Sequence, residues 1–309
     1  MIAGAPSGGP MDASTDAPTR PSTDPSTDAP TDAPTDASFR HDGFRFAAEL
    51  TGKGRRLMFC HGSGGSRASS RFILEALAEH ASVAAHDQRG LGETGLRRDA
   101  PDPFLDAQTW TMADYAADAL AFADSLGWST FALLGISFGG MVAQEVAVTA
   151  PDRLECLVLM CSSAGGAGRA SFPLHVPRNL AAEQERQLVL QLIDSRFDDE
   201  WLADRPFETA MVRFRDAQAA RPRTEEQMVG EHGQLLARAG HDVWDRLPRV
   251  SCPTLVASGR FDLIAPSANS AAIASQVQDG RFAEFDGGHA FFVQDKAAWP
   301  AVYEFLAES

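Results

Sequence analysis

The regular alternation of short apolar runs with longer amphipathic segments is the feature that most constrains this chain's fold. The apolar runs occupy residues 56–60, 82–87, 131–135, 156–161, 254–259 and 281–286. Segments with the apolar spacing of helices, at 71–81, 111–127 and 139–150, separate the earlier runs. Nearly continuous apolar strands that alternate with helices are typical of a parallel sheet covered on both faces. We therefore predict an α/β fold with a mostly parallel central sheet and an early hairpin around residues 44–50.

The alternation stops between residues 165 and 245. This part has few strand-like runs and several amphipathic helical stretches, such as 180–197 and 207–220. An insertion of this size between two strands predicts a helical cap over the strand ends, where open α/β sheets bind their ligands. The predicted organisation is a core of residues 41–164 and 246–309, with a cap insertion at 165–245.

The first 40 residues are predicted to be a disordered tail. Their Thr-Asp-Ala-Pro repeats offer almost nothing to bury, and proline interrupts any regular backbone. The tail lacks the basic and apolar regions of a signal peptide. No stretch of about 18 apolar residues occurs in the chain, so we expect no membrane span.

Charge and cysteine usage restrict the partners and the cellular compartment expected for the protein. The formal net charge is −15 at pH 7, which disfavours nucleic acid and anionic membranes as partners. The four cysteines lie in or beside apolar runs with no zinc-binding spacing, and we expect them to be reduced and buried: Cys60, Cys156, Cys161 and Cys252. These features predict a cytoplasmic protein without a metal site.

A serine stands at an unusual place, between the apolar run 131–135 and the helical segment 139–150. The stretch is Gly-Ile-Ser-Phe-Gly-Gly, with Ser137 at its centre. One interpretation is a tight turn with a space-filling serine. The other is a nucleophile, because the glycines at 135 and 139 would let the backbone turn sharply and raise the hydroxyl at the end of the strand.

Two further strand ends carry the groups that a serine nucleophile needs. Asp262 follows the apolar run 254–259, and His289 lies in the glycine-rich loop after 281–286. A serine hydroxyl requires a base to take its proton and a carboxylate to orient that base. The order Ser137, Asp262, His289 matches the order that follows a G-x-S-x-G turn. The other strand end that might supply the acid, at 162–166, contains no carboxylate.

The chain resembles the α/β-hydrolase superfamily, in its capped esterase-like branch, over residues 43–308. The motifs that carry the resemblance are "HGSGG", "DQRGLGET", "GISFGGM", "GRFDLIAP" and "GGHAFF". The resemblance implies Ser137 as nucleophile, His289 as general base and then acid, and Asp262 as the carboxylate that holds His289. It implies an oxyanion hole formed by the backbone amides of Ser63 and Phe138, and no cofactor. Haloalkane dehalogenases, which need an aspartate nucleophile, are excluded by Ser137.

Other polar residues near these motifs receive structural interpretations. His61 is expected to brace the oxyanion loop, and Asp87 and Arg89 to hold a turn and a local ion pair. His232 and His241 are expected at the surface or at helix ends. The aromatic and sulfur-containing residues of the cap that are candidates to line a pocket are Phe172, His175, Trp201, Phe207, Met211 and Trp244.

The first functional hypothesis is a serine hydrolase that acts on a small carboxylic ester or lactone. An alternative with the same triad is hydrolysis of a C–C bond in meta-cleavage products, which requires a basic residue for the substrate carboxylate. The cap arginines available for it are Arg169, Arg178, Arg196, Arg213 and Arg215. A further alternative is a non-catalytic ligand receptor on the same scaffold.

Overall fold

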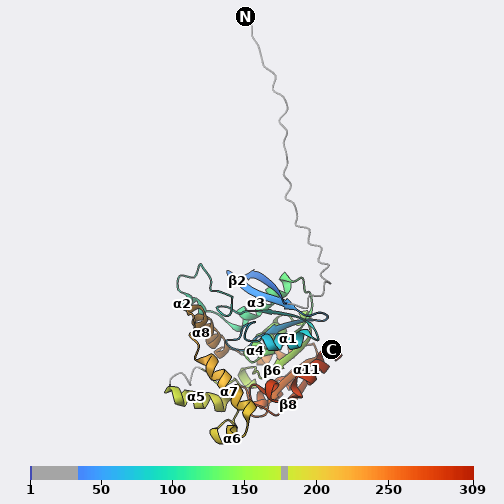
Figure 1. Cartoon of the computed structure of the whole chain (residues 1–309). Helices are drawn as coiled ribbons and strands as arrows, with labels where there is room; N and C mark the ends of the chain where they lie inside the picture. Colours follow the sequence, from blue (N-terminus) through green and yellow to red (C-terminus); the bar gives the residue numbers. More distant parts are fainter. Residues whose placement is uncertain (2–33, 175–179) are drawn as a thin grey trace. The chain divides into compact units, whose positions relative to one another are not determined.

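The computed structural model describes residues 34–174 and 180–309 together with Met1. They form an eight-stranded sheet in the order β1-β2-β4-β3-β5-β6-β7-β8 (Figure 1). The strands are β1 (Thr35–His41), β2 (Phe44–Thr51), β3 (Arg56–Cys60), β4 (Ser82–His86), β5 (Phe131–Ile136), β6 (Leu154–Met160), β7 (Thr254–Gly259) and β8 (Gly280–Phe285). Strands β3 to β8 pair in parallel, and β2 pairs antiparallel with both β1 and β4. The predicted, mostly parallel α/β fold is confirmed.

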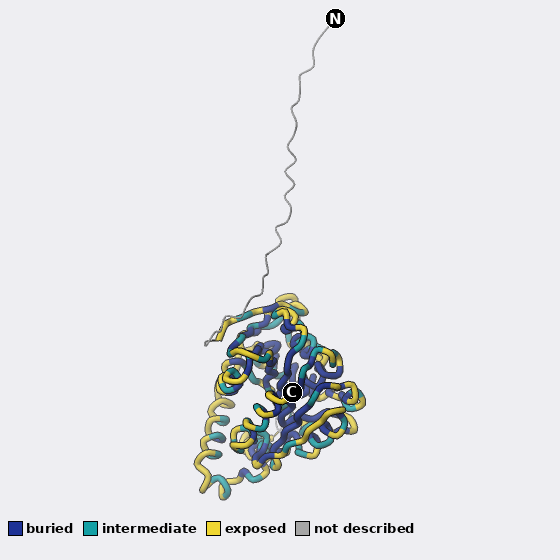
Figure 2. The backbone as a smooth tube through the Cα atoms, turned by 90° about the vertical axis from the view of Figure 1, so that its right-hand side faces the viewer, coloured by how far each residue is buried: buried dark blue, intermediate teal, exposed yellow. Residues whose placement is uncertain are grey.

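The helices lie on both faces of this sheet and in the insertion between β6 and β7. They are α1 (Arg71–Ala78), α2 (Pro103–Ala107), α3 (Met112–Ser125), α4 (Phe138–Thr149), α5 (Ala182–Ile193), α6 (Asp199–Ala203), α7 (Pro206–Ala219), α8 (Glu225–Ala239), α9 (Ser267–Gln276), α10 (Phe291–Gln294) and α11 (Ala298–Glu308). Alternate residues of the central strands enter opposite cores: Leu133 packs with residues of α3 and α4, whereas Leu134 packs with residues of α1 and α11. Figure 2 shows that buried residues fill the interior and that exposed residues lie along the outer turns and helices.

The early hairpin is present, and it begins sooner than predicted. Asp42 and Gly43 form its turn with φ of 45° and 77°, as a two-residue Asp-Gly hairpin requires. In β1, Phe39 stacks on Phe46 at 4.6 Å between ring centroids and is buried. Residues 35–40 are therefore a strand and not part of a tail, because the burial of one aromatic ring outweighs their polar composition. The rest of the predicted tail, 2–33, lies outside the described residues.

The insertion between β6 and β7 contains α5 to α8. The amphipathic stretches at 180–197 and 207–220 contain α5 and α7, as predicted. Helix α8 contributes Val229 and Ala237 to the main hydrophobic core. Part of the insertion is thus packed as core.

All four cysteines are free and buried, as expected. Burial raises the pKa of the Cys60 thiol to about 12, so this group stays protonated. Within residues 34–174 and 180–309, no helix has both the length and the apolar character needed to cross a membrane.

Candidate active site

Ser137 lies at a sharp backbone turn between β5 and α4. Its φ is 56° and its ψ is −113°, and few residues other than glycine adopt such a positive φ. A Cβ on Gly135 would lie 2.2 Å from the carbonyl oxygen of Gly139, and one on Gly139 would lie 2.0 Å from that of Cys60. Both positions therefore need glycine, and the strained turn holds the serine at the carboxyl end of β5.

The neighbouring strand fixes this turn. The Ser137 amide donates to the carbonyl of Met160 at 2.8 Å, and the Ser162 hydroxyl donates to the carbonyl of Ser137 at 3.0 Å. Helix α4 begins directly after the serine, so its positive dipole end faces the region of the hydroxyl. The side chain of Ser137 is thus held in a favourable place for charge that develops beside it.

Asp262 follows β7 and is buried. One carboxylate oxygen accepts hydrogen bonds from the amides of Ile264 and Ala265, at 2.8 and 2.9 Å. The other oxygen accepts from Nδ1 of His289 at 2.7 Å. The backbone amides therefore fix the carboxylate so that one oxygen is left for the histidine.

His289 follows β8 and connects the acid to the serine. Its Nε2 lies 2.9 Å from the Ser137 hydroxyl oxygen. Because a carboxylate can only accept, Nδ1 is the donor to Asp262, and the other ring nitrogen, Nε2, faces the Ser137 hydroxyl. The structure thus brings together the three residues predicted as a triad, from the ends of β5, β7 and β8.

The loop after β3 approaches Ser137. A Cβ on Gly62 would lie 3.8 Å from the Cβ of Ser137. Neither of the amides predicted to form an oxyanion hole, those of Ser63 and Phe138, donates a hydrogen bond to another residue that the structure describes. Both amides are therefore available to an oxygen bound beside the serine.

A family model described as the alpha/beta hydrolase fold matches residues 55–296, which is more than half of the chain. The chain belongs to the α/β-hydrolase family. Its resemblance to this family is thereby confirmed.

Relatives of this α/β hydrolase carry the names of several hydrolases. A putative carbamate hydrolase (RutD) of Azorhizobium caulinodans is 28% identical over 248 residues, covering 79% of this chain and 87% of the relative. A pimeloyl-[acyl-carrier protein] methyl ester esterase of Aeromonas salmonicida is 28% identical over 243 residues, covering 73% of this chain and 84% of the relative. The crystal structure of a hydrolase from Pseudomonas aeruginosa PA01 matches with a TM-score of 0.66 and 26% identity, covering 88% and 98%. These names support a hydrolase and differ in substrate.

His61 of the hydrolase connects the end of β3 to the start of α1. Its ring is fully buried, and Nδ1 is 2.9 Å from the hydroxyl oxygen of Ser70. Burial, with the nearby His86 and Arg67, lowers the pKa of His61 to about 3. The ring is therefore neutral at ordinary pH.

Asp87 and Arg89 form ion pairs with different partners. Asp87 accepts from the amide and from Nε of Arg67, at 2.7 and 3.2 Å, and from the amide of Glu93. Arg89 donates to both carboxylate oxygens of Asp118, at 2.7 and 2.9 Å. The expectation of a held turn is met, but the expectation of a local ion pair was wrong, because the partners Arg67 and Asp118 lie 20 and 29 residues away in the chain.

The candidate pocket residues of the insertion lie in different surroundings. Phe207 is half exposed on α7, Trp201 packs against Phe197, and the ring of Trp244 lies against Gly168. His241 follows the end of α8, which is one of the two places expected for it, and it is buried there. The candidates His175 and Arg178 lie outside the described residues.

Sequence reasoning also missed residues of the insertion that contact the loops of the triad. The Leu263 amide donates to the carbonyl of Leu192, and the His289 amide donates to that of Ile193. On α8, Gln234 accepts from the amide of Gly64 at 2.8 Å. A usable signal existed only for Gln234, which shares one helical face with the apolar residues Val229 and Ala237.

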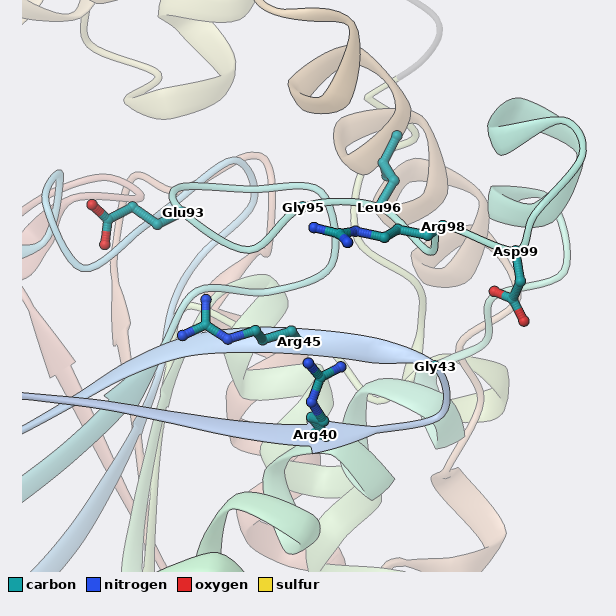
Figure 3. Close-up of a pocket in the computed structure, with 8 residues that line it drawn as sticks. All are labelled: Arg40, Gly43, Arg45, Glu93, Gly95, Leu96, Arg98 and Asp99. Carbon is teal, nitrogen blue, oxygen red and sulfur yellow. The ribbon is translucent and has the colours of Figure 1, made fainter.

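A hollow of about 450 Å³ lies at the β1–β2 hairpin and contains none of the triad residues (Figure 3). The arginines that line it, Arg40, Arg45 and Arg98, are exposed. The two carboxylates that line it already pair elsewhere, Glu93 with Arg67 and Asp99 with Arg97. Across residues 34–174 and 180–309, no group of three or more His, Cys, Asp or Glu side chains is arranged to hold a metal ion.

Proposed function

We propose that this α/β hydrolase is a serine hydrolase that cleaves a small carboxylic ester or lactone through an acyl-enzyme on Ser137. The observation that carries the proposal is the continuous chain from the Asp262 carboxylate through His289 to the Ser137 hydroxyl, with contacts of 2.7 and 2.9 Å. A serine at a strained turn with an oriented base is the arrangement that nucleophilic acyl transfer requires.

The acylation step follows from this geometry. The Ser137 oxygen attacks the substrate carbonyl carbon while Nε2 of His289 accepts the hydroxyl proton. The carbonyl oxygen becomes an oxyanion and is stabilised by the amides of Ser63 and Phe138. When the intermediate collapses, the C–O bond breaks and His289 gives its proton to the leaving alkoxide. The product is an ester on Ser137, and a lactone would keep its alcohol attached to the acyl group.

Deacylation repeats the sequence with water. His289 takes a proton from a water molecule as the water oxygen attacks the acyl carbon, and then returns that proton to the Ser137 oxygen. Asp262 remains ionised and stabilises the imidazolium that forms in each half-reaction. The insertion at 165–245 is proposed to limit the substrate to a small, partly apolar molecule.

The direct test is labelling with a fluorophosphonate probe, in the wild type beside Ser137→Ala, followed by a series of p-nitrophenyl esters of rising acyl length. We expect labelling of the wild type alone and a fall in ester turnover of about 10³-fold or more in the variant. Full esterase activity in Ser137→Ala would refute the proposal. Absence of labelling in both proteins would favour a non-catalytic ligand receptor.

The C–C hydrolase alternative receives less support. Arg196, one of the cap arginines available for a substrate carboxylate, already pairs with Asp194 at 2.7 Å and with Asp286 at 2.8 Å. Its guanidinium lies 3.9 Å above the ring of Phe261. Faster turnover of a coloured meta-cleavage product than of any p-nitrophenyl ester would replace the ester assignment with this alternative.

A further inference from the structure

A buried glutamine of the insertion reaches the oxyanion loop. Gln234 lies on α8 and is 1% exposed. Its side-chain oxygen accepts from the Gly64 amide at 2.8 Å, and its Nε2 donates to the side-chain oxygen of Gln88. The orientation of the amide group follows from chemistry, because a backbone N–H can only donate. Gln234 thus joins the loop after β3 to the loop after β4.

The bonded amide is next to a predicted oxyanion donor. Gly64 follows Ser63, so only the φ and ψ of Ser63 separate the held peptide unit from the one that carries the Ser63 amide. Three glycines surround that residue, at 62, 64 and 65, and glycine leaves a backbone unusually free. Within the loop the Gly65 amide donates to the carbonyl of Gly62 at 3.0 Å, and the bonds that hold the next residues begin at Ser66. Gln234 therefore restricts a segment that otherwise has wide conformational freedom.

Helix α8 is itself fixed in place. A Cβ on Gly230 would lie 2.7 Å from the carbonyl oxygen of Arg89, and one on Gly233 would lie 2.3 Å from the ring of Trp110. These two glycines let the helix backbone pack directly on the core within one turn of Gln234. The glutamine is therefore held on a rigid support.

We infer that Gln234 is a positioning residue for the oxyanion hole. The insertion would then contribute to transition-state stabilisation as well as cover the strand ends. Gln234 acts through Gly64 and the Ser63 amide and need not contact the substrate. This inference rests on the proposed serine mechanism. Loss of an oxyanion donor costs about 10²–10³ in kcat, and a donor that is present but loosely held should cost less.

The test compares Gln234→Met with Gln234→Glu. Methionine fills a similar volume without a strong acceptor, whereas glutamate keeps an acceptor oxygen for the Gly64 amide. We expect Gln234→Met to lower kcat about 10- to 100-fold with KM changed less than about threefold, and Gln234→Glu to recover most of that loss. Leu236→Ala, at an exposed position of the same helix, is the matched control and should leave kcat unchanged.

A second readout separates positioning from folding. A trifluoromethyl ketone forms a tetrahedral adduct when the Ser137 oxygen adds to its carbonyl, and its oxyanion occupies the same hole. The affinity of the enzyme for this ketone should fall in Gln234→Met in parallel with kcat. The kcat value is divided by the fraction of sites that the fluorophosphonate labels. Unchanged normalised kcat and ketone affinity would overturn the inference, even if the melting temperature falls. Activity retained in Ser137→Ala would instead overturn the proposed function, so the two failures are distinguishable.

Discussion

Helices α7 and α8 lie in the same insertion, but their packing is very different. Helix α8 buries six residues, Val229, Gly230, Gly233, Gln234, Ala237 and Arg238, whereas α7 buries only Val212. Val212 joins a small separate cluster with Leu190 and Phe197, while α8 enters the main core. The exposed fraction of Phe214 on α7 is 68%. The insertion therefore has an inner part, which includes α8 and packs on the core, and an outer part, which includes α7 and has few buried residues.

This difference shows that the insertion, although continuous in the sequence, is not a separate unit in its packing. Besides α8, the inner part includes the end of α5 and the residues directly after it. The Ser195 amide donates to the carbonyl of Phe261, and the carbonyl of Ile193 accepts from the His289 amide. Segments with few buried contacts are the ones that open most easily. We therefore expect substitutions in the inner part to disturb both stability and catalysis, and those in the outer part to disturb stability little.

The largest effect should come from Asp194→Ala, in the inner part. Asp194 is fully buried and accepts from Arg196 and from the side-chain amide of Gln294, whose oxygen accepts from the Gly288 amide beside His289. Removing this carboxylate takes an acceptor from the Gln294 amide and from the Arg196 guanidinium, which keeps Asp286, and should cost about 3 kcal/mol in lost hydrogen bonds. Urea unfolding should report this loss together with a lower kcat. A fall in activity with unchanged stability would contradict the expectation that the inner part supports both stability and catalysis.

The next effect should come from Gly230→Ala, which pushes α8 away from the core. The added methyl group would meet backbone atoms of Arg89 and Gly90 at 2.7 to 3.0 Å, and backbone cannot yield as a side chain can. Overpacking of this kind costs about 2 kcal/mol. The measurement is the midpoint of urea unfolding. A fully stable variant would show that α8 is not firmly docked, and would weaken the case for Gln234.

A third prediction uses His241, at the end of α8. Burial, opposed by Glu145 and assisted by Arg246, lowers the pKa of His241 to about 4. The unfolded chain, with a pKa near 6.5, then binds the proton more readily than the folded chain, so stability falls as the pH drops from 6.5 towards 4. Each pH unit in this window costs about 1.4 kcal/mol for this group.

His241→Gln should therefore flatten the decline in stability between pH 6.5 and 5.5 by about 1 kcal/mol. The measurement is the free energy of unfolding at the two pH values, in wild type and variant. Two other buried histidines, His61 and His86, have pKa values lowered to about 3 and about 4 and would keep part of the decline. Parallel pH profiles would contradict a contribution from His241.

The smallest effect should come from Phe214→Ser on α7. An exposed side chain away from a core changes stability by less than about 0.5 kcal/mol. The expected result is an unchanged unfolding midpoint and unchanged kcat, with any change confined to KM. A loss comparable to that of Gly230→Ala would show that the outer part is as firmly packed as the inner part.

The sequence predicted the sheet and the three strand ends that carry Ser137, Asp262 and His289. Each of these signals is local, because an apolar run is followed directly by a glycine-rich loop with one chemical group. The roles of Gln234 and Asp194 were not predictable in this way. Their partners Gly64 and Gln294 lie 170 and 100 residues away in the chain, so no local pattern marks either contact. Strand β1 was missed because its polar composition concealed one buried ring.

The contact between Ser137 and His289 joins residues 152 positions apart in the chain. During synthesis, the serine emerges long before the histidine, which lies within the last 21 residues. On the proposed mechanism, and because domains fold largely as units, Ser137 has no base until β8 and the loop after it have been made and have joined the sheet. A ribosome-bound chain that ends before residue 289 would then carry an inert serine, so the onset of probe labelling would report the assembly of the strand ends of β5, β7 and β8.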